Sequence, residues 1–119
     1  MPSAPVLLLV NNDVGVLTAL AVLLSGDFVV ETANTAGEAL GMIACGIEPD
    51  LIVADVYLDR LDGIALRSEL PAWLRSRVVL MTCSPVRGAM ASAIHASGVP
   101  VVHRSTELHL LEPIMKAVA

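Results

Sequence analysis

The residue with the clearest chemical potential is Asp55, which directly follows a short apolar run from Leu51 to Ala54. The length and aliphatic content of this run are typical of a strand buried on both faces. A turn-rich segment follows Asp55 and closes with Asp62-Gly63. In open α/β sheets, ligands bind at the carboxyl ends of the strands. We therefore take Asp55 as the candidate reactive carboxylate.

Polar side chains also follow other apolar runs of the chain. They are Asn11, Asn12 and Asp13 after the first run, Thr82 after the fourth and Arg104 after the fifth. Parallel strands of one sheet bring their carboxyl ends to the same edge. The pattern alone therefore predicts that these side chains converge around Asp55.

The elements that would position these residues alternate along the chain. Apolar runs predict strands at 6–10, 28–33, 51–54, 78–81 and 99–102. Helical spacing and capping signals predict helices at about 16–24, 36–45, 63–70, 84–97 and 106–118. Pro113 should kink the last helix or mark where its regular part begins. Trp73, the only tryptophan, lies in a connection and is expected to cap the core.

Strict alternation of strands and helices predicts a single α/β domain over residues 1–119. Near-continuous apolar strands with helical crossovers indicate a parallel, doubly wound sheet. For a (βα)5 chain we expect the flavodoxin-like strand order 2-1-3-4-5, with the site at the switch between the first and third strands.

Composition excludes several classes of protein. The chain is 55% hydrophobic and carries a net charge of −5, which disfavours direct contact with nucleic acid. No apolar stretch is long enough to span a membrane and no signal peptide is visible, so we expect a cytoplasmic protein. Cys45 and Cys83 lack CxxC spacing and are expected to be free, buried thiols.

Together these residues resemble the receiver domain of bacterial response regulators in two-component systems. The resemblance covers nearly the whole chain. It is carried by the stretch from Pro49 to Asp55, by the spacing to Asp62-Gly63, and by Val79-Leu80-Met81-Thr82. It implies that Asp55 accepts a phosphoryl group from a phosphohistidine on a sensor histidine kinase or phosphotransfer protein. It also implies that the domain signals by protein contact and is not an enzyme.

The chain departs from the pattern of this family at several positions. By resemblance, an acidic pair after the first strand would bind Mg²⁺ with the acceptor and the backbone carbonyl of Tyr57, yet that pair falls on Asn11 and Asn12. Two neutral amides remove about two charges from the site, so we expect Mg²⁺ to bind Asp55, Asn12 and Tyr57 weakly or not at all. Arg104 replaces the family's lysine and is expected to pair with Asp55.

Further departures affect the switch and the signalling surface. Val101 stands where the family has an aromatic switch residue, and Thr82 keeps the hydroxyl that would contact the phosphoryl group. The family's signalling surface maps onto residues 87–97, 101–102 and 108–118, a weakly charged face suited to an effector protein or a homodimer.

Two functions stay open on the sequence alone. One is phosphoacceptance by Asp55, and the other is a pseudo-receiver that acts by binding without phosphate. A flavin or nucleotide site would need a phosphate loop, and a hydrolase would need a nucleophile elbow. The chain has neither. His95, His103 and His109 lack metal-ligand spacing and are expected at the surface.

Overall fold

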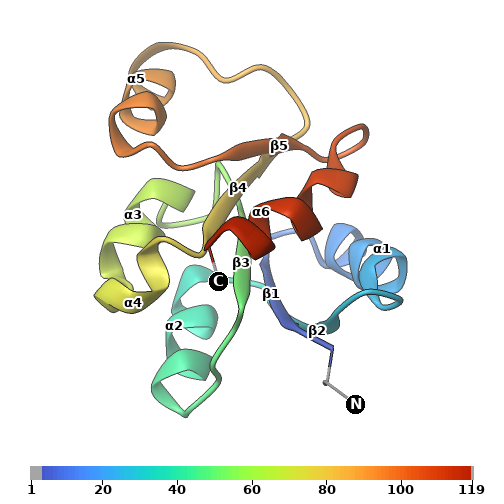
Figure 1. Cartoon of the computed structure of the whole chain (residues 1–119). Coiled ribbons are helices and arrows are strands. Elements are labelled where there is room, and N and C mark those ends of the chain that lie inside the picture. Colours follow the sequence, from blue (N-terminus) through green and yellow to red (C-terminus); the bar gives the residue numbers. More distant parts are fainter. Residues whose placement is uncertain (1–3, 119) are drawn as a thin grey trace.

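The computed structural model describes residues 4–118 and contains a five-stranded parallel sheet. The strand order is β2-β1-β3-β4-β5, which confirms the predicted doubly wound topology (Figure 1). The strands are β1 (Val6–Val10), β2 (Val29–Ala33), β3 (Leu51–Asp55), β4 (Val78–Thr82) and β5 (Val101–His103). The helices are α1 (Val14–Leu24), α2 (Ala36–Ala44), α3 (Gly63–Glu69), α4 (Ala72–Arg75), α5 (Gly88–Ser97) and α6 (Leu111–Val118), with a 3₁₀ turn η1 (Leu108–Leu110) before α6.

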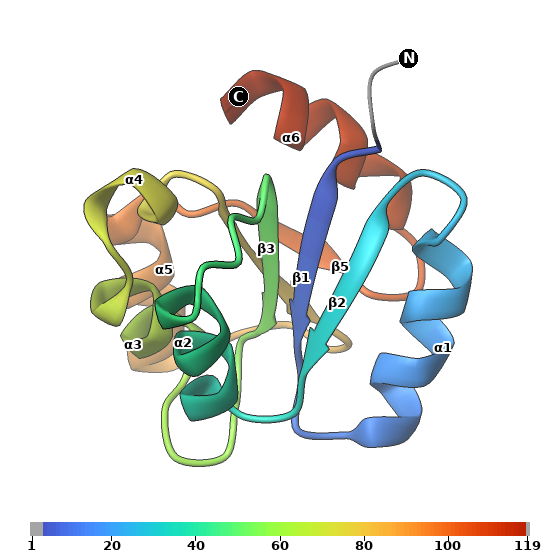
Figure 2. The same cartoon turned by 90° about the horizontal axis from the view of Figure 1, so that it is seen from below.

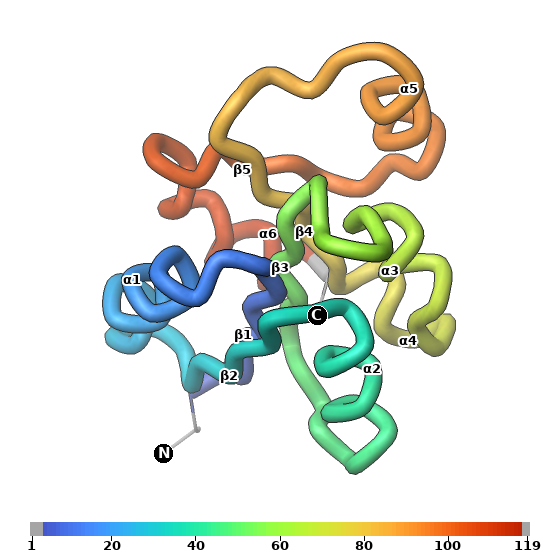
Figure 3. The backbone as a smooth tube through the Cα atoms, turned by 180° about the vertical axis from the view of Figure 1, so that it is seen from behind, coloured from blue at the N-terminus to red at the C-terminus, as the bar shows by residue number. Residues whose placement is uncertain are grey.

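Helices cover both faces of the sheet, as Figure 2 shows. α1 and α6 pack on one face, where Leu17 and Leu111 join the buried strand residues Leu9 and Val53. α2, α3, α4 and α5 lie on the other face, and Figure 3 shows α3 and α4 side by side there. Because successive residues of a strand point to opposite faces, every central strand contributes to both cores.

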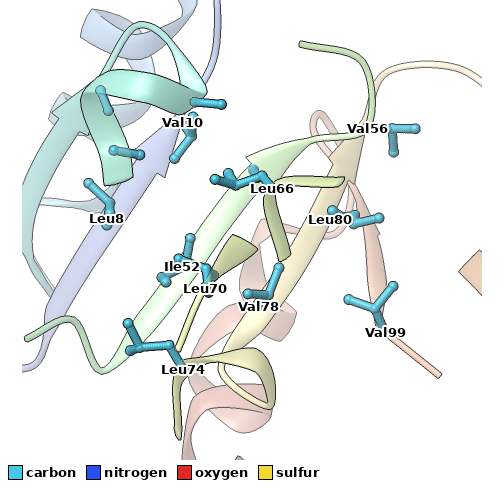
Figure 4. Packing of buried hydrophobic residues seen from close by; sticks show 14 residues of the cluster. Leu8, Val10, Ile52, Val56, Leu66, Leu70, Leu74, Val78, Leu80 and Val99 are labelled. Carbon is cyan, nitrogen blue, oxygen red and sulfur yellow. The ribbon is translucent and has the colours of Figure 1, made fainter. Parts of the chain in front are cut away.

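The core between the sheet and α2–α5 is made of interdigitating aliphatic side chains. Ile52 and Leu80 from neighbouring strands belong to one buried cluster with Leu66 of α3, Leu70 directly after α3 and Leu74 of α4 (Figure 4). Each of these five side chains is at most 1% exposed. This packing holds β3 and β4 in place along the strand direction. It therefore determines where their carboxyl ends reach the surface.

Two predicted helix starts were wrong, and one short helix was not predicted. α5 begins at Gly88 instead of Ser84, because Gly88 has φ +66° and a right-handed helix cannot continue through that conformation. The last helix begins at Leu111 instead of Thr106, which places Pro113 in its first turn, where a missing N–H costs little. The connection that holds Trp73 contains the short helix α4.

Three side chains are also more exposed than the sequence suggested. Cys45 follows the last residue of α2 and Cys83 follows β4, and both are exposed free thiols. Trp73 is 48% exposed, and the guanidinium of Arg77 lies 5.3 Å from the centre of its ring. Each of the three stands at the end of an element or in a surface helix, where the chain turns away from the core. No helix within residues 4–118 is long and apolar enough to cross a membrane.

Candidate functional site

Asp55 is the last residue of β3 and stands at the carboxyl edge of the sheet. The four preceding strand residues, Leu51 to Ala54, are buried, whereas Asp55 is half-buried. Asp55 is in register with Met81 of β4, and Ala54 is in register with Val10 of β1. The carboxylate therefore lies where the chain leaves β1 on one side and β4 on the other, at the edge of the sheet where the loops after β1, β2 and β3 gather (Figure 2).

Asn11, the first residue after β1, contacts Asp55 directly. Its Nδ2 donates a hydrogen bond to Asp55 Oδ2 at 3.1 Å. Its Oδ1 accepts a hydrogen bond from the backbone N–H of Asp13 at 2.8 Å. Asn11 is 1% exposed and is the one buried polar side chain of the residues described. The structure thus brings together the two residues that the switch-point argument placed side by side.

Asn12 and Asp13 lie outside this contact. Asn12 is exposed. Asp13 caps the N-terminus of α1, where its Oδ1 accepts a hydrogen bond from the Val16 N–H at 3.2 Å. The carboxylate of Asp13 therefore caps α1, and the side-chain hydrogen bond to Asp55 comes from Asn11.

Thr82, at the end of β4, is occupied by the loop that follows it. Its Oγ1 donates to the Ser84 carbonyl at 2.5 Å and accepts from the Ser84 N–H at 3.2 Å. No hydrogen bond joins Thr82 to Asp55 among the residues described. Before the hydroxyl could donate to a ligand at Asp55, it would have to leave Ser84.

Arg104 follows β5 and is tied to β4 through its backbone, because its N–H donates to the Thr82 carbonyl at 2.8 Å. The expected ion pair between Arg104 and Asp55 is not formed. In the described part of the chain, an ion pair is found only between Lys116 and Glu112. Arg104 acts on Asp55 through its charge at longer range, and the side chain in direct contact with the carboxylate is that of Asn11.

Several opposing effects act on the pKa of Asp55. Burial raises this pKa above its ordinary value of 3.8, because the charged form loses hydration. The backbone N–H of Val56, the positive charge of Arg104 and the hydrogen bond from Asn11 each lower the pKa, but burial outweighs them.

The loop after β3 returns close to Asp55. Asp62 caps α3 by accepting a hydrogen bond from the Ala65 N–H at 2.7 Å, and the Gly63 N–H donates to the Val56 carbonyl at 2.9 Å. A Cβ atom at Gly63 would stand 2.7 Å from the backbone oxygen of Asp55. The close approach to the end of β3 therefore requires a glycine at position 63. Tyr57 lies at the start of this loop with 56% of its surface exposed.

The residues at this edge do not fit a divalent cation. Mg²⁺ requires oxygen ligands and favours carboxylates. Asn11 instead turns an N–H group towards Asp55, because its oxygen is engaged by Asp13. Within residues 4–118, no group of three or more His, Cys, Asp or Glu side chains is arranged to hold a metal.

Sequence reasoning missed two contributors to the site. Asn34 follows β2, and its Nδ2 donates to the Asn11 backbone carbonyl at 3.2 Å. Its place after a strand next to β1 is the signal that could have found it. Ser84, the partner of Thr82, lay inside a predicted helix, so the loop geometry that makes it a partner was not visible in the sequence.

Comparison of the sequence finds no matching family model and no matching curated protein. Comparison of the structure finds receiver domains. The signal receiver domain of an HD domain-containing protein from Pseudomonas fluorescens Pf-5 aligns with a TM-score of 0.82 and 24% identity, over 99% of this chain and 91% of that one. A CheY-like response regulator receiver domain protein from Methanospirillum hungatei JF-1 aligns with a TM-score of 0.80 and 22% identity, over 98% and 94%.

A third similar structure is the signal receiver domain of a signal transduction histidine kinase from Syntrophus aciditrophicus. It aligns with a TM-score of 0.78 and 22% identity, over 97% of this chain and 89% of that one. All three alignments cover nearly the entire chain, so the likeness concerns the complete domain and not one βαβ unit. The chain has the flavodoxin-like fold of response regulator receiver domains.

Proposed function

We propose that the chain is a receiver-type signalling domain of a cytoplasmic phosphorelay, in which Asp55 accepts a phosphoryl group from a phosphohistidine. The donor would be a sensor histidine kinase or a phosphotransfer protein. The observation that carries this proposal is the position of Asp55: a half-buried carboxylate at the end of a central strand, hydrogen-bonded to Asn11 after β1 and close enough to Arg104 to be influenced by its charge.

The chemistry requires a nucleophile and a means of stabilising the phosphoryl oxygens. One Asp55 carboxylate oxygen would form the new O–P bond while the P–N bond of the phosphohistidine breaks and its electron pair returns to the imidazole, which then takes a proton from water. Phosphoryl transfer depends mainly on positioning and charge stabilisation. Arg104 would supply positive charge, and Thr82 would supply a hydroxyl donor.

The hydrogen bond of Thr82 suggests how the signal would leave the site. Its hydroxyl donates to Ser84 in the unphosphorylated protein. A phosphoryl group on Asp55 would compete for that donor and release the loop between β4 and α5. A hollow lined by Thr82, Val86, Ile94 and Val101 lies beside this loop. The affected surface of α5, β5 and α6 would bind an effector protein or a second copy of the chain.

A second candidate function follows from Asn11 and Asn12. Two amides stand where the receiver pattern has carboxylates. Asn11 already donates a hydrogen bond to Asp55 in the unphosphorylated state. This arrangement favours a pseudo-receiver that binds its partner, or dimerises, without phosphate.

Intact-mass measurement separates the two functions. The wild-type protein is incubated with a small phosphodonor and Mg²⁺ beside a standard receiver domain as positive control. The proposal predicts one phosphoryl adduct on the wild type and none on Asp55→Ala. An unmodified wild type, under conditions that modify the standard receiver, would favour the pseudo-receiver.

A further inference from the structure

The side-chain amide of Asn11 has a fixed orientation. Its Oδ1 faces the backbone N–H of Asp13 at 2.8 Å, and its Nδ2 faces Asp55 Oδ2 at 3.1 Å. A backbone N–H can only donate and an ionised carboxylate can only accept. The reversed amide would set two donors against each other on one side and two acceptors on the other. An N–H group of Asn11 therefore points at Asp55 when Asp55 is ionised.

The backbone of Asn11 is held as firmly as its side chain. Its N–H donates to the Ala33 carbonyl at 3.2 Å, and its carbonyl accepts from Asn34 Nδ2 at 3.2 Å. The side chain is 1% exposed, so water does not compete for the amide. Because its backbone and side chain are both fixed, the buried N–H donor of Asn11 is preorganised to stabilise a negative charge on Asp55. The amide does not have to reorient when Asp55 is ionised.

A hydrogen-bond donor and a metal ion stabilise a carboxylate in the same way, by placing positive charge beside an oxygen. They cannot occupy the same side of it. Mg²⁺ needs oxygen ligands in a near-ideal octahedron and gives up its water reluctantly. Beside Asp55 Oδ2 it would meet the hydrogens of the Asn11 amide, which cannot ligate a cation. To offer its oxygen, the amide would have to turn over and abandon both hydrogen bonds.

We propose that Asn11 is a positioning residue that takes the place of a divalent cation beside Asp55. It orients the carboxylate through a fixed N–H donor and makes the site independent of Mg²⁺. The inference rests on the proposed function insofar as Asp55 is the acceptor. The arrangement of donor and carboxylate exists without phosphoryl transfer, so cation binding can be measured on its own.

The test is a Mg²⁺ titration of ¹⁵N-labelled protein followed by NMR, reading the Val56 backbone amide in every protein and the Asn11 side-chain amide in those that keep Asn11. Three proteins are compared: wild type, Asn12→Asp and the double variant Asn11→Ala/Asn12→Asp. Asn12→Asp adds a carboxylate to the same loop but leaves the Asn11 amide facing Asp55. Asn11→Ala/Asn12→Asp keeps that carboxylate and removes the Asn11 donor without adding a further charge.

The wild type should show no saturable shift of either signal. The double variant should bind Mg²⁺ with saturation, and Asn12→Asp should bind it at least about tenfold more weakly, because the amide still blocks the carboxylate. Adding Asp55→Asn to the double variant should abolish binding, which would place the cation at this site. Dispersed ¹⁵N spectra would establish that each variant is folded.

Two results would overturn the proposal. One is saturable Mg²⁺ binding by the wild type at this site. The other is equal affinity of Asn12→Asp and the double variant, which would show that the Asn11 amide does not matter. Neither result bears on whether Asp55 is phosphorylated, so a failure here remains distinct from a failure of the proposed function.

Discussion

The fold partly buries the carboxylate of Asp55, and neighbouring groups offset part of the hydration that the charge loses. Burial raises its pKa, while Val56, Arg104 and Asn11 act in the opposite direction. A group whose pKa is raised on folding favours the folded state below its unfolded pKa and loses that contribution as the pH rises through the folded pKa. At neutral pH, the charge of Asp55 is therefore held at some cost in stability.

This cost predicts that Asp55→Asn raises the melting temperature at pH 7. The gain should shrink as the pH falls towards the unfolded pKa, near the ordinary value of 3.8, because there the wild-type carboxyl is also neutral. Differential scanning calorimetry across this pH range measures it. Asp59→Asn is the matched control, since Asp59 is an exposed carboxylate in the next loop. An equal gain in both variants would contradict a burial effect at Asp55.

Arg104 is expected to influence Asp55 through charge alone, since no ion pair joins them. Arg104→Met should raise the pKa of Asp55 further, because a positive charge that favours the ionised form is lost. Arg104→Lys keeps the charge and should leave the pKa close to the wild-type value. An NMR titration of the Asp55 side-chain carboxyl carbon distinguishes them. If Arg104→Met titrates like the wild type, the long-range interaction is absent.

The loop from Asp55 to α3 depends on a close contact between two backbones. Gly63 packs so tightly that a Cβ atom would stand 2.7 Å from the Asp55 oxygen and 2.5 Å from Leu80 Cδ2. One of these neighbours is backbone and cannot rotate away. The contact therefore ties the start of α3 to the end of β3, and it explains why glycine follows the helix cap Asp62.

Gly63→Ala should reduce the free energy of unfolding by about 1–3 kcal/mol, the usual cost of overpacking. Gly41→Ala is the control, because Gly41 lies inside α2 and a Cβ atom added there would meet no other atom within 4 Å. That change should stabilise the protein by about 0.5–1 kcal/mol through helix propensity. Urea unfolding of both variants measures the difference. A stable Gly63→Ala protein would show that the loop can move away from β3.

The ends of the helices show which local signals are visible in a sequence. Thr35 caps α2 by accepting a hydrogen bond from the Glu38 N–H, and Gly98 ends α5 in the left-handed conformation. Both residue types are typical at these positions, so the sequence carries these two signals. The start of α5 was not predictable, because Ser84-Pro85 is a good helix start by composition. What moves the start is the left-handed Gly88, and a sequence does not reveal which glycines adopt that conformation.

For the whole molecule, the topology of the sheet was predictable and so was the meeting of Asn11 with Asp55. Both follow from apolar runs with polar ends and from the strand order of doubly wound sheets. The distance of Arg104 and the direction of the Asn11 amide were not predictable. They depend on side-chain placement within a few ångströms, which strand register leaves open.

The domain as a whole would thus be a receiver fold whose acceptor is served by an amide in place of a metal. Its fold agrees with that of receiver domains of known structure. The feature that bears on a metal is the Asn11 amide, which faces Asp55 from the loop after β1. Metal dependence is therefore the property in which it should depart most from a receiver that has an acidic pair.

The most direct measurement is the rate at which Asp55 gains a phosphoryl group from a small phosphodonor, followed by intact mass with Mg²⁺ and with EDTA. We predict one adduct, formed at the same rate in both conditions and lost in Asp55→Ala. A standard receiver run in parallel should need Mg²⁺. An adduct that forms only with Mg²⁺, or no adduct in either condition, would contradict a metal-independent acceptor at Asp55.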